Sequence, residues 1–367
     1  MHPSVRRLGR FFMGHLDGPL LGAVLILMGV GLVVLYSASN ASLMRVSTQL
    51  VNIMVALGVL WLFANIPPHY LMRLSVPVYI LGLMLLLAVA LWGDVVNGAR
   101  RWLNVGVTRI QPSELMKIAV PLMLAWYFDR YEATLKLKNY VIGAVLLVVP
   151  VAFIARQPDL GTAVLIFASG CYVLFLAGLS WRVMGGLALA GAACLPLVWS
   201  VLHDYQRQRL LTLLDPTQDP LGRGYHTIQS TIAVGSGGLA GKGWLNGSQT
   251  HLDFIPERTT DFIFAVYSEE FGLIGNAILL ILFLLVIGRG AAITANAPTL
   301  FTRLLAGAFT LTFFTYAFVN MGMVSGILPV VGVPLPLVSY GGTSLVTICL
   351  GFGILMSIHT HKKLVQT

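Results

Sequence analysis

Long apolar runs dominate this chain, and short polar stretches separate them. Most runs are about 20 residues long, the length that a helix needs to cross a bilayer core of about 30 Å. The pattern predicts an all-α polytopic membrane protein, because helices satisfy their own backbone groups in lipid. We expect ten spanning helices near 19–37, 47–65, 70–92, 113–130, 139–155, 160–179, 181–202, 261–287, 302–326 and 342–359.

The composition agrees with a membrane protein. Hydrophobic residues make up 57% of the 367 residues and charged residues only 10%, far less charge than a soluble domain carries. The formal charge of +9 does not indicate nucleic-acid binding, because the basic residues are scattered through loops rather than gathered in a stripe. Cys171, Cys194 and Cys349 fall inside apolar runs without disulfide or metal spacing, so we interpret them as buried hydrophobic residues.

The charges near the chain ends predict the orientation. An even number of spans puts both termini on one side, and the positive-inside rule places that side in the cytoplasm. The first span follows a basic start without a small-residue cleavage site, so we expect it to stay as an anchor in the cytoplasmic (inner) membrane. The basic residues assigned to this side are Arg6, Arg7, Arg10, Arg130, Lys136, Lys138, Arg182, Arg289, Arg303, Lys362 and Lys363.

Two substantial loops, 93–112 and 203–260, then lie outside. The larger loop keeps Trp244 and Phe254 among its glycines, which is typical of a folded, functional loop. We interpret it as part of one domain spanning 1–367. Two explanations for the charge of both loops stay open, namely binding of an anion and simple solvation. The residues concerned are Arg100, Arg101, Arg109, Arg207, Arg209, Arg223, Lys242 and Arg258.

The segment RRWLNVGVTRIQPSELMKIAVP (100–121) places ionisable groups at the start of a span. Ser113 is a candidate N-cap, and Glu114 and Lys117 are three residues apart, so they share a helix face. Lys117 lies about one turn inside the membrane, which costs about 2.5–3.5 kcal/mol on insertion scales and calls for a partner or a cavity. It either pairs with Glu114 or binds an anionic headgroup.

Two further segments carry candidate chemistry. In RQPDLGTAV (156–164), Asp159 either caps the next helix or pairs with Lys117 or a metal in a shared cavity. LPVVGVPLPLVSYGGTS (328–344) has prolines and glycines at membrane depth, where irregular backbone is tolerated only if protein or a cavity covers it. It predicts a re-entrant segment or broken helix lining a site, with a plain outer loop as the alternative.

The stretch FIPERTTDFIFAVYSEEF (254–271) concentrates charge at the start of the eighth span. Thr259 or Thr260 is expected to cap the helix and to leave Asp261 ionised in its first turn. Such a carboxylate can accept a proton from a hydroxyl. The alternative is that it contributes only its negative charge at the start of the helix. Glu269 and Glu270 lie deeper and are interpreted as structural.

Two features of the large loop suggest weaker hypotheses. GSGGLAGKG (235–243) lacks the glycine and the Ser or Thr that a P-loop requires. Its amides and Lys242 are candidates for phosphate binding, against a tight turn packed on the membrane surface. A metal site using His226 and His251 also stays open, although their spacing matches no specific pattern.

Four motifs together make the chain resemble a known family. FIPERTTDFIFAVYSEEFGLIG, RIQPSELMKIAVP, RQPDLGTA and GILPVVGVPLPLVSYGGTS occur in this order, and the likeness covers nearly the whole chain. They resemble the SEDS family (shape, elongation, division, sporulation). The short tails favour its elongation branch over its division branch.

The resemblance implies a GT-C-like bundle of ten spans that acts as a peptidoglycan glycosyltransferase. Such an enzyme polymerises lipid II outside the cytoplasmic membrane, with a class B penicillin-binding protein and other elongation-complex proteins as partners. The family's essential aspartate matches Asp261. Its other polar site residues match Arg109, Glu114, Lys117 and Asp159.

The implied mechanism is an inverting transfer. Asp261 is the hypothetical base on the 4-hydroxyl of the acceptor sugar, and Arg109 and Lys117, with Arg101 or Arg258, stabilise the departing pyrophosphate. No cofactor is certain, and a divalent cation (Mg²⁺ or Mn²⁺) stays open. The alternatives are a lipid II flippase and a non-catalytic scaffold.

Overall fold

The computed structural model describes residues 14–96, 99–104, 109–193, 207, 211–212, 224–251, 254–255 and 257–361. Several predictions concern residues outside these ranges, including the second half of the seventh span and much of the 203–260 loop. Individual residues outside them are Arg6, Arg7, Arg10, Cys194, Arg209, Arg223, Lys362 and Lys363.

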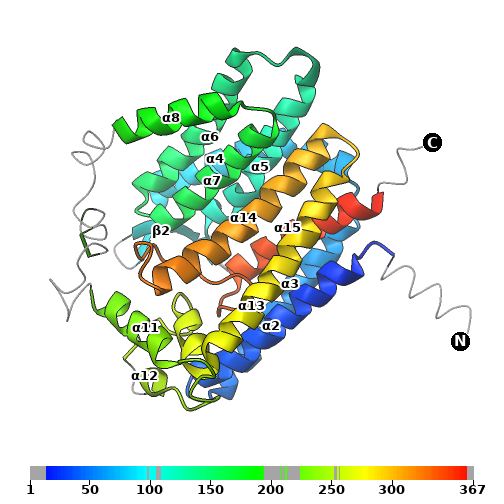
Figure 1. Ribbon diagram of the computed structural model, residues 1–367. Helices are drawn as coiled ribbons and strands as arrows, with labels where there is room; N and C mark the ends of the chain where they lie inside the picture. Colours follow the sequence, from blue (N-terminus) through cyan, green and yellow to red (C-terminus); the bar gives the residue numbers. More distant parts are fainter. Residues whose placement is uncertain are drawn as a thin grey trace, which may run out of the picture.

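The described chain folds into a bundle of long helices (Figure 1). Seven of the described helices are long and apolar enough to cross a membrane, and α7 is a shorter apolar helix. The predicted helical membrane fold is confirmed, while the number of ten spans stays a prediction. The bundle helices are α2 (Gly18–Ala38), α3 (Leu43–Ala64), α4 (Pro68–Trp92), α5 (Pro112–Arg130), α6 (Leu137–Arg156), α7 (Leu160–Leu176), α8 (Trp181–Ala193), α13 (Ile263–Ala295), α14 (Leu300–Val324) and α15 (Thr343–Thr360).

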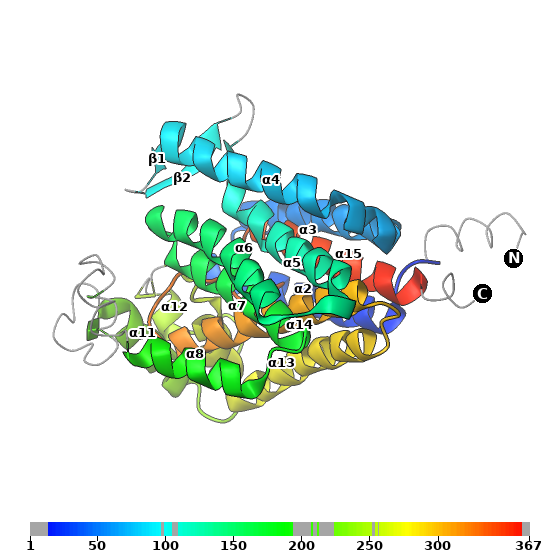
Figure 2. The ribbon, with the colours of Figure 1, turned by 90° about the horizontal axis from the view of Figure 1, so that it is seen from above.

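The bundle has two distinct ends (Figures 1 and 2). α2 begins and α15 ends at one of them, which we call the terminal end. Polar contacts join helices there: Arg289 of α13 binds Asp17, the N-cap of α2, and the Phe301 amide of α14 donates to Asp129 of α5 at 2.8 Å. The opposite end, which we call the loop end, carries the short helices α11 (Tyr225–Ser236) and α12 (Ser248–His251).

A three-stranded antiparallel sheet also lies at the loop end (Figure 2). It comprises β1 (Asp94–Val96), β2 (Ala99–Asn104) and β3 (Arg109–Ile110), in that order. Asn104 pairs with Arg109, directly before α5 begins. The sequence predicts this stretch only as a loop, because strands of two to six residues leave too little alternation to recognise. The short η1 helix (Glu132–Thr134) joins α5 to α6.

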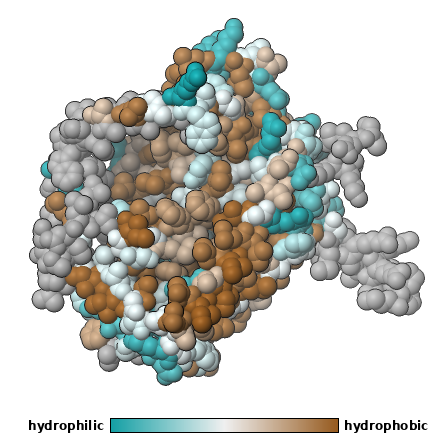
Figure 3. Space-filling view, in the orientation of Figure 1, coloured by the Kyte–Doolittle hydropathy of each residue, from teal (hydrophilic) through white to brown (hydrophobic). Residues whose placement is uncertain are grey.

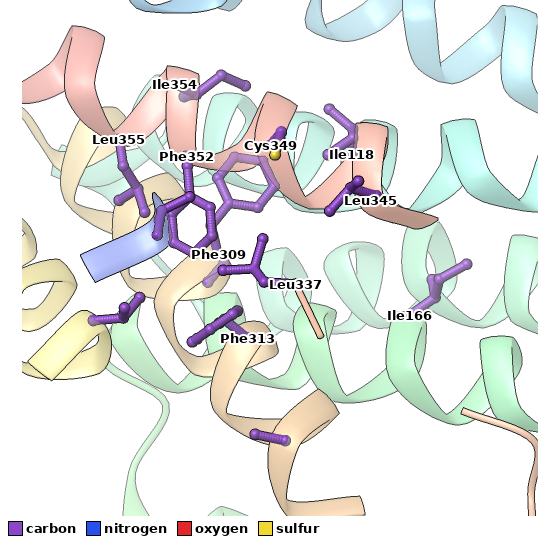
Figure 4. Close-up of a cluster of buried hydrophobic side chains, with 14 of the residues drawn as sticks. Ile118, Ile166, Phe309, Phe313, Leu337, Leu345, Cys349, Phe352, Ile354 and Leu355 are labelled. Atoms are coloured by element: carbon purple, nitrogen blue, oxygen red, sulfur yellow. The ribbon is translucent and has the colours of Figure 1, made fainter. Parts of the chain in front are cut away.

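The core runs through α5, α14 and α15. Phe309 and Phe313 of α14 face Phe352 and Leu355 of α15 (Figure 4). Small residues permit close helix contacts, as in other membrane bundles: a Cβ at Gly353 of α15 would lie 2.5 Å from the Leu60 carbonyl of α3. The inner helices are therefore fixed by side-chain interdigitation and close backbone approach.

Outer helices present apolar side chains to their surroundings. Apolar residues cover much of the face where α13 lies (Figure 3), and Ile274, Ile278, Ile281 and Leu285 of this helix are exposed. Exposed apolar side chains at these helical intervals are what a lipid-facing helix presents. The surface therefore fits the predicted location in a membrane.

α13 is broken at Gly272, which has a left-handed φ of 62° and ψ of −160°. A break frees backbone donors and acceptors, and a buried group without a partner is costly. The glycine-rich segment 237–243 binds these groups. The pairs are Leu273 N to Gly238 O (2.9 Å), Ile274 N to Leu239 O (3.1 Å), Lys242 N to Glu269 O (3.0 Å) and Gly243 N to Glu270 O (3.0 Å). The segment is thus a tight turn packed against the break in α13.

Candidate functional site

Asp261 lies in a turn immediately before α13 rather than in its first helical turn. The helix begins at Ile263, and its N-cap residue Phe262 makes no side-chain cap. The expected cap by Thr259 or Thr260 is therefore wrong. The Thr260 hydroxyl instead donates to the Glu257 carboxylate at 3.1 Å and to its carbonyl at 3.2 Å.

The segment 328–342, between α14 and α15, holds the Asp261 turn in place. The segment contains no helix or strand, as the interpretation of an irregular, site-lining segment requires. Three successive carbonyls of the turn have partners. These contacts are Tyr340 N to Thr259 O (2.9 Å), Ser339 Oγ to Thr260 O (2.6 Å) and Asn320 Nδ2 to Asp261 O (2.7 Å). Because the backbone at Asp261 and at the two preceding residues is bonded, the direction in which the side chain leaves the backbone is fixed.

The Asp261 carboxylate faces the same segment. Gly332 has a φ of 72°, and a Cβ there would lie 3.4 Å from Asp261 Oδ2. A Cβ at Gly161, near the start of α7, would lie 2.7 Å from the Val331 carbonyl. Residues 331–332 of this segment therefore lie between the start of α7, where Asp159 lies, and the Asp261 turn.

His226 of α11 lies beside the turn and stacks on Phe262, with ring centroids 5.8 Å apart. Burial lowers the pKa of His226 below its ordinary value of 6.5, and the negative charge of Glu257 opposes this effect only in part. Burial therefore favours the neutral form of this imidazole, a polar group beside the Asp261 turn.

Glu114 and Lys117 form an ion pair at the start of α5. Lys117 Nζ lies 2.6 Å from Glu114 Oε1, and Thr347 of α15 donates to Glu114 Oε2 at 2.9 Å. The Lys117 ammonium also lies 5.3 Å from the ring centroid of Tyr316 on α14. Lys117, Tyr316 and Thr347 border a cavity of about 40 Å³, which is enough for a water molecule. The pairing of Glu114 with Lys117, one of the two alternatives, is observed.

Asp159 caps α7 and joins the sheet to the bundle. It accepts from the Thr162 amide at 3.4 Å and from Gln111 Nε2 at 3.0 Å. Arg101 of β2 lies 3.9 Å from Asp159 Oδ1 and donates to the Gln157 carbonyl at 3.2 Å. Among the described contacts, Asp159 is paired with Arg101 rather than with Lys117.

The remaining predicted cations occupy different environments. Arg258, three residues before Asp261, donates to the Thr250 carbonyl of α12. Lys242 lies 2.7 Å from the Glu269 carboxylate and donates to Ser248 at 2.7 Å. Arg109 is exposed in β3. All three belong to the loop end, as do Asp261 and Asp159.

Several residues that build this site were not among the predicted site residues. Tyr316 and Asn320 are one turn apart on α14 and link the Lys117 pair to the Asp261 turn. A polar residue inside an apolar span indicates such a role, so Asn320 was detectable. Thr347 and Ser339 gave no comparable signal, because hydroxyl residues are common in membrane helices and loops.

The described residues offer no ready-made metal site. No group of three or more His, Cys, Asp or Glu side chains in this part of the chain is placed to hold a metal ion. The side chain of His251 lies outside the described part of the structure, so the hypothetical two-histidine site stays a prediction.

Comparison with known proteins identifies the family. Residues 19–364 match the FtsW–RodA–SpoVE family model, described as cell cycle protein, so the chain belongs to this family. The SEDS resemblance is thereby confirmed. The chain is 52% identical to the peptidoglycan glycosyltransferase MrdB of Escherichia coli K12 over 353 residues, which cover 96% of this chain and 95% of MrdB.

Solved structures of related proteins share the fold. One, described as "Structural coordination of polymerization and crosslinking by a peptidoglycan synthase complex", matches with a TM-score of 0.81 and 35% identity, over 96% of this chain and 99% of that one. The rod shape determining protein RodA of Thermus thermophilus matches with a TM-score of 0.72 and 29% identity, over 94% and 97% of the two chains.

Proposed function

We propose that this protein is a peptidoglycan glycosyltransferase that polymerises lipid II during cell elongation. The similarity to MrdB over nearly its full length supports the reaction class. The observation that carries the proposal is the fixed Asp261 turn, whose carboxylate faces the 328–342 segment at the loop end. A rigid backbone holds a general base in the geometry that proton transfer requires.

In the proposed step, the Asp261 carboxylate takes the proton of the 4-hydroxyl of the acceptor sugar. The hydroxyl oxygen forms a bond to C1 of the donor sugar while the bond from C1 to the pyrophosphate oxygen breaks. The bonding electrons leave with undecaprenyl pyrophosphate. A single displacement converts an α-linked donor into a β-linked glycan, so the site needs one base and no covalent carboxylate.

As the C1–O bond breaks, the departing pyrophosphate gains one negative charge on its freed oxygen, which nearby cations can stabilise. We assign this role to Lys117, Arg101, Arg109 and Arg258. Lys117 keeps further N–H donors beyond the one directed at Glu114, because an ammonium has three. Glu114 and Asp159 then serve to orient Lys117 and Arg101.

A divalent cation is an open addition to these side chains. Mg²⁺ is commonly held by one or two carboxylates together with substrate phosphates, and the described residues supply no larger set. The proposed step therefore relies on the protein side chains alone.

The proposed setting is the cytoplasmic membrane, with both termini in the cytoplasm and Asp261 on the outer side. The proposed partner is a class B penicillin-binding protein, a transpeptidase that cross-links the product, within a larger elongation complex. The structural match to a chain from a peptidoglycan synthase complex supports such a partnership.

The test is polymerisation of labelled lipid II by the purified protein with its class B partner, resolved on a gel. Wild type is compared with Asp261→Asn and with Asp94→Asn, a matched control for the same chemical change in β1. Folding and partner binding are checked for each. We expect polymer from wild type and Asp94→Asn only.

The other outcomes separate the alternatives. Polymer from Asp261→Asn at the wild-type rate would remove Asp261 as the base. An absence of polymer from all folded samples would instead favour the flippase or scaffold, and a lipid II translocation assay in vesicles would then distinguish these two.

A further inference from the structure

Glu269 is a buried carboxylate that the proposed mechanism does not use. Its relative exposure is 0%, and it lies on the first half of α13, three residues before the break at Gly272. A charge in such a place is costly unless it is paired and hydrogen-bonded. Its partners therefore indicate why it is there.

The Glu269 carboxylate binds α12 and the glycine-rich segment together. Each of its two oxygens accepts more than one hydrogen bond. The donors are Lys242 Nζ (2.7 Å), Ser248 Oγ (3.2 Å) and Gln249 N (3.0 Å) to Oε1, and Thr250 N (3.3 Å) and Thr250 Oγ1 (3.2 Å) to Oε2. Two of these donors are backbone amides at the start of α12, so the carboxylate fixes the position of this short helix.

α12 in turn holds Arg258. The Arg258 guanidinium donates to the carbonyl of Thr250, the same residue whose amide and hydroxyl bind Glu269. Thr250 is fully buried. A continuous series of contacts therefore runs from Glu269 through Thr250 to Arg258 and ends in the turn that carries Asp261.

We propose that Glu269 is a positioning residue that sets the Arg258 guanidinium toward the pyrophosphate of the lipid-linked substrate. The inference rests on the proposed function, and it adds a residue that does not touch the substrate. Lys242 then belongs to the same support, because its ammonium is directed at Glu269. Glu270, the neighbouring buried carboxylate, is directed elsewhere and accepts from Ser37 of α2.

The test is a double-mutant cycle on binding of fluorescent lipid II in detergent, in the Asp261→Asn background so that no turnover occurs. Arg258→Gln and Glu269→Gln are each expected to weaken binding by roughly tenfold, the effect of losing one charge-assisted contact. If Glu269 acts through Arg258, the two losses do not multiply, and the double variant binds about as weakly as Arg258→Gln alone.

Glu270→Gln is the matched control, since it replaces an equally buried carboxylate one residue away. Any loss that it causes is expected to multiply with that of Arg258→Gln. Should Glu269→Gln not fold, Thr250→Val removes one hydroxyl contact with little change of shape. It is expected to weaken binding roughly threefold, and only when Arg258 is present.

Unchanged binding by Glu269→Gln, or a loss that multiplies with that of Arg258→Gln, would overturn the inference. The binding measurement does not depend on polymerisation. A wild type that binds lipid II but makes no polymer would therefore refute the proposed reaction without deciding the role of Glu269.

Discussion

The Glu114–Lys117 pair shows how a buried charge can serve both folding and chemistry. Lys117 is 8% exposed and Glu114 contacts it at 2.6 Å, so each residue neutralises the other in a poorly solvated place. Removing one partner of such a pair leaves a buried charge without a counter-charge and destabilises the fold. Removing both partners often changes the free energy of unfolding little. The two consequences can be separated by mutation.

We expect Lys117→Met to lower stability by about 3 kcal/mol and polymerisation by about 10²–10³-fold. The double variant Glu114→Gln/Lys117→Met should regain most of the stability without regaining activity. Thermal unfolding in detergent and initial rates of lipid II polymerisation measure the two effects. Recovery of polymerisation in the double variant would show that Lys117 has no role beyond the pair.

Asp17 makes a second ion pair, at the terminal end, with Arg289 at 2.5 Å and His359 at 3.3 Å. Burial acts to raise the pKa of Asp17, but the hydrogen bonds from Arg289 and the Leu20 amide, together with the charge of Arg289, outweigh it and hold the pKa below 3.8. A lowered carboxylate pKa stabilises the fold above its unfolded value and loses this contribution as pH falls through the folded value.

The stability contributed by Asp17 should therefore be present above the unfolded pKa of 3.8 and be lost progressively as the pH falls from there through the lower folded pKa. Asp17→Asn removes the charge but keeps an N-cap side chain, so it should cost about 1–2 kcal/mol at pH 7. Melting temperatures of wild type and variant should converge as the pH is lowered from 5 toward 3. Curves that stay parallel over this range would contradict the assignment.

At the scale of elements, the break in α13 is the feature that organises the loop end. Gly272 occupies a backbone region that is essentially restricted to glycine, and a Cβ there would lie 2.3 Å from the Gly241 amide. The glycine-rich segment can approach the broken helix closely enough for hydrogen bonds because both segments have a glycine at this contact, Gly241 and Gly272.

Gly272→Ala is expected to cost about 2–3 kcal/mol and to loosen the contact with 237–243. Gly288→Ala is the matched control, since it lies in the same helix with no atom within 4 Å of its added Cβ. Melting of both variants in detergent, followed by fluorescence of the solubilised protein, tests the difference. Equal melting temperatures would refute the structural role of the break.

The sequence predicted the helices better than the contacts between them. The expected spans lie within a few residues of α2 to α7, α14 and α15. The length of an apolar run shows directly whether the run can cross the lipid bilayer. The start of α13 lies two residues from its expected position, but the helix continues to Ala295, eight residues beyond the expected end. The expected cap was wrong, since the Thr260 hydroxyl binds Glu257 rather than the helix amides. The role of Glu269 was interpreted only as structural, because its partner Lys242 is 27 residues away in the chain and no periodicity links them.

At the scale of the whole molecule, the arrangement of helix ends separates two kinds of surface. The loop end carries Asp261, Asp159 and the proposed substrate-binding cations, while the terminal end carries the Asp17 pair and the Asp129 contact with α14. The proposed function places the loop end on the outer side of the membrane and the terminal end in the cytoplasm.

Asn246→Cys at the loop end and Glu132→Cys in η1 should report this orientation, since both positions are exposed. The three native cysteines are first replaced. A membrane-impermeant thiol reagent is then expected to label Asn246→Cys in cells whose outer envelope is permeabilised but whose cytoplasmic membrane is closed. Glu132→Cys should react only after the cytoplasmic membrane is opened. The reverse pattern would place Asp261 on the cytoplasmic side and contradict the proposed function.

The proposed role of Asp261 as general base can be tested by measuring the polymerisation rate together with lipid II binding. The initial rate of polymerisation at saturating lipid II is compared for wild type, Asp261→Asn and Asp94→Asn, with lipid II affinity determined for each. We predict that Asp261→Asn binds lipid II within about threefold of wild type and polymerises it at least about 10²-fold more slowly. A rate near that of wild type, or a loss explained entirely by weaker binding, would contradict the account.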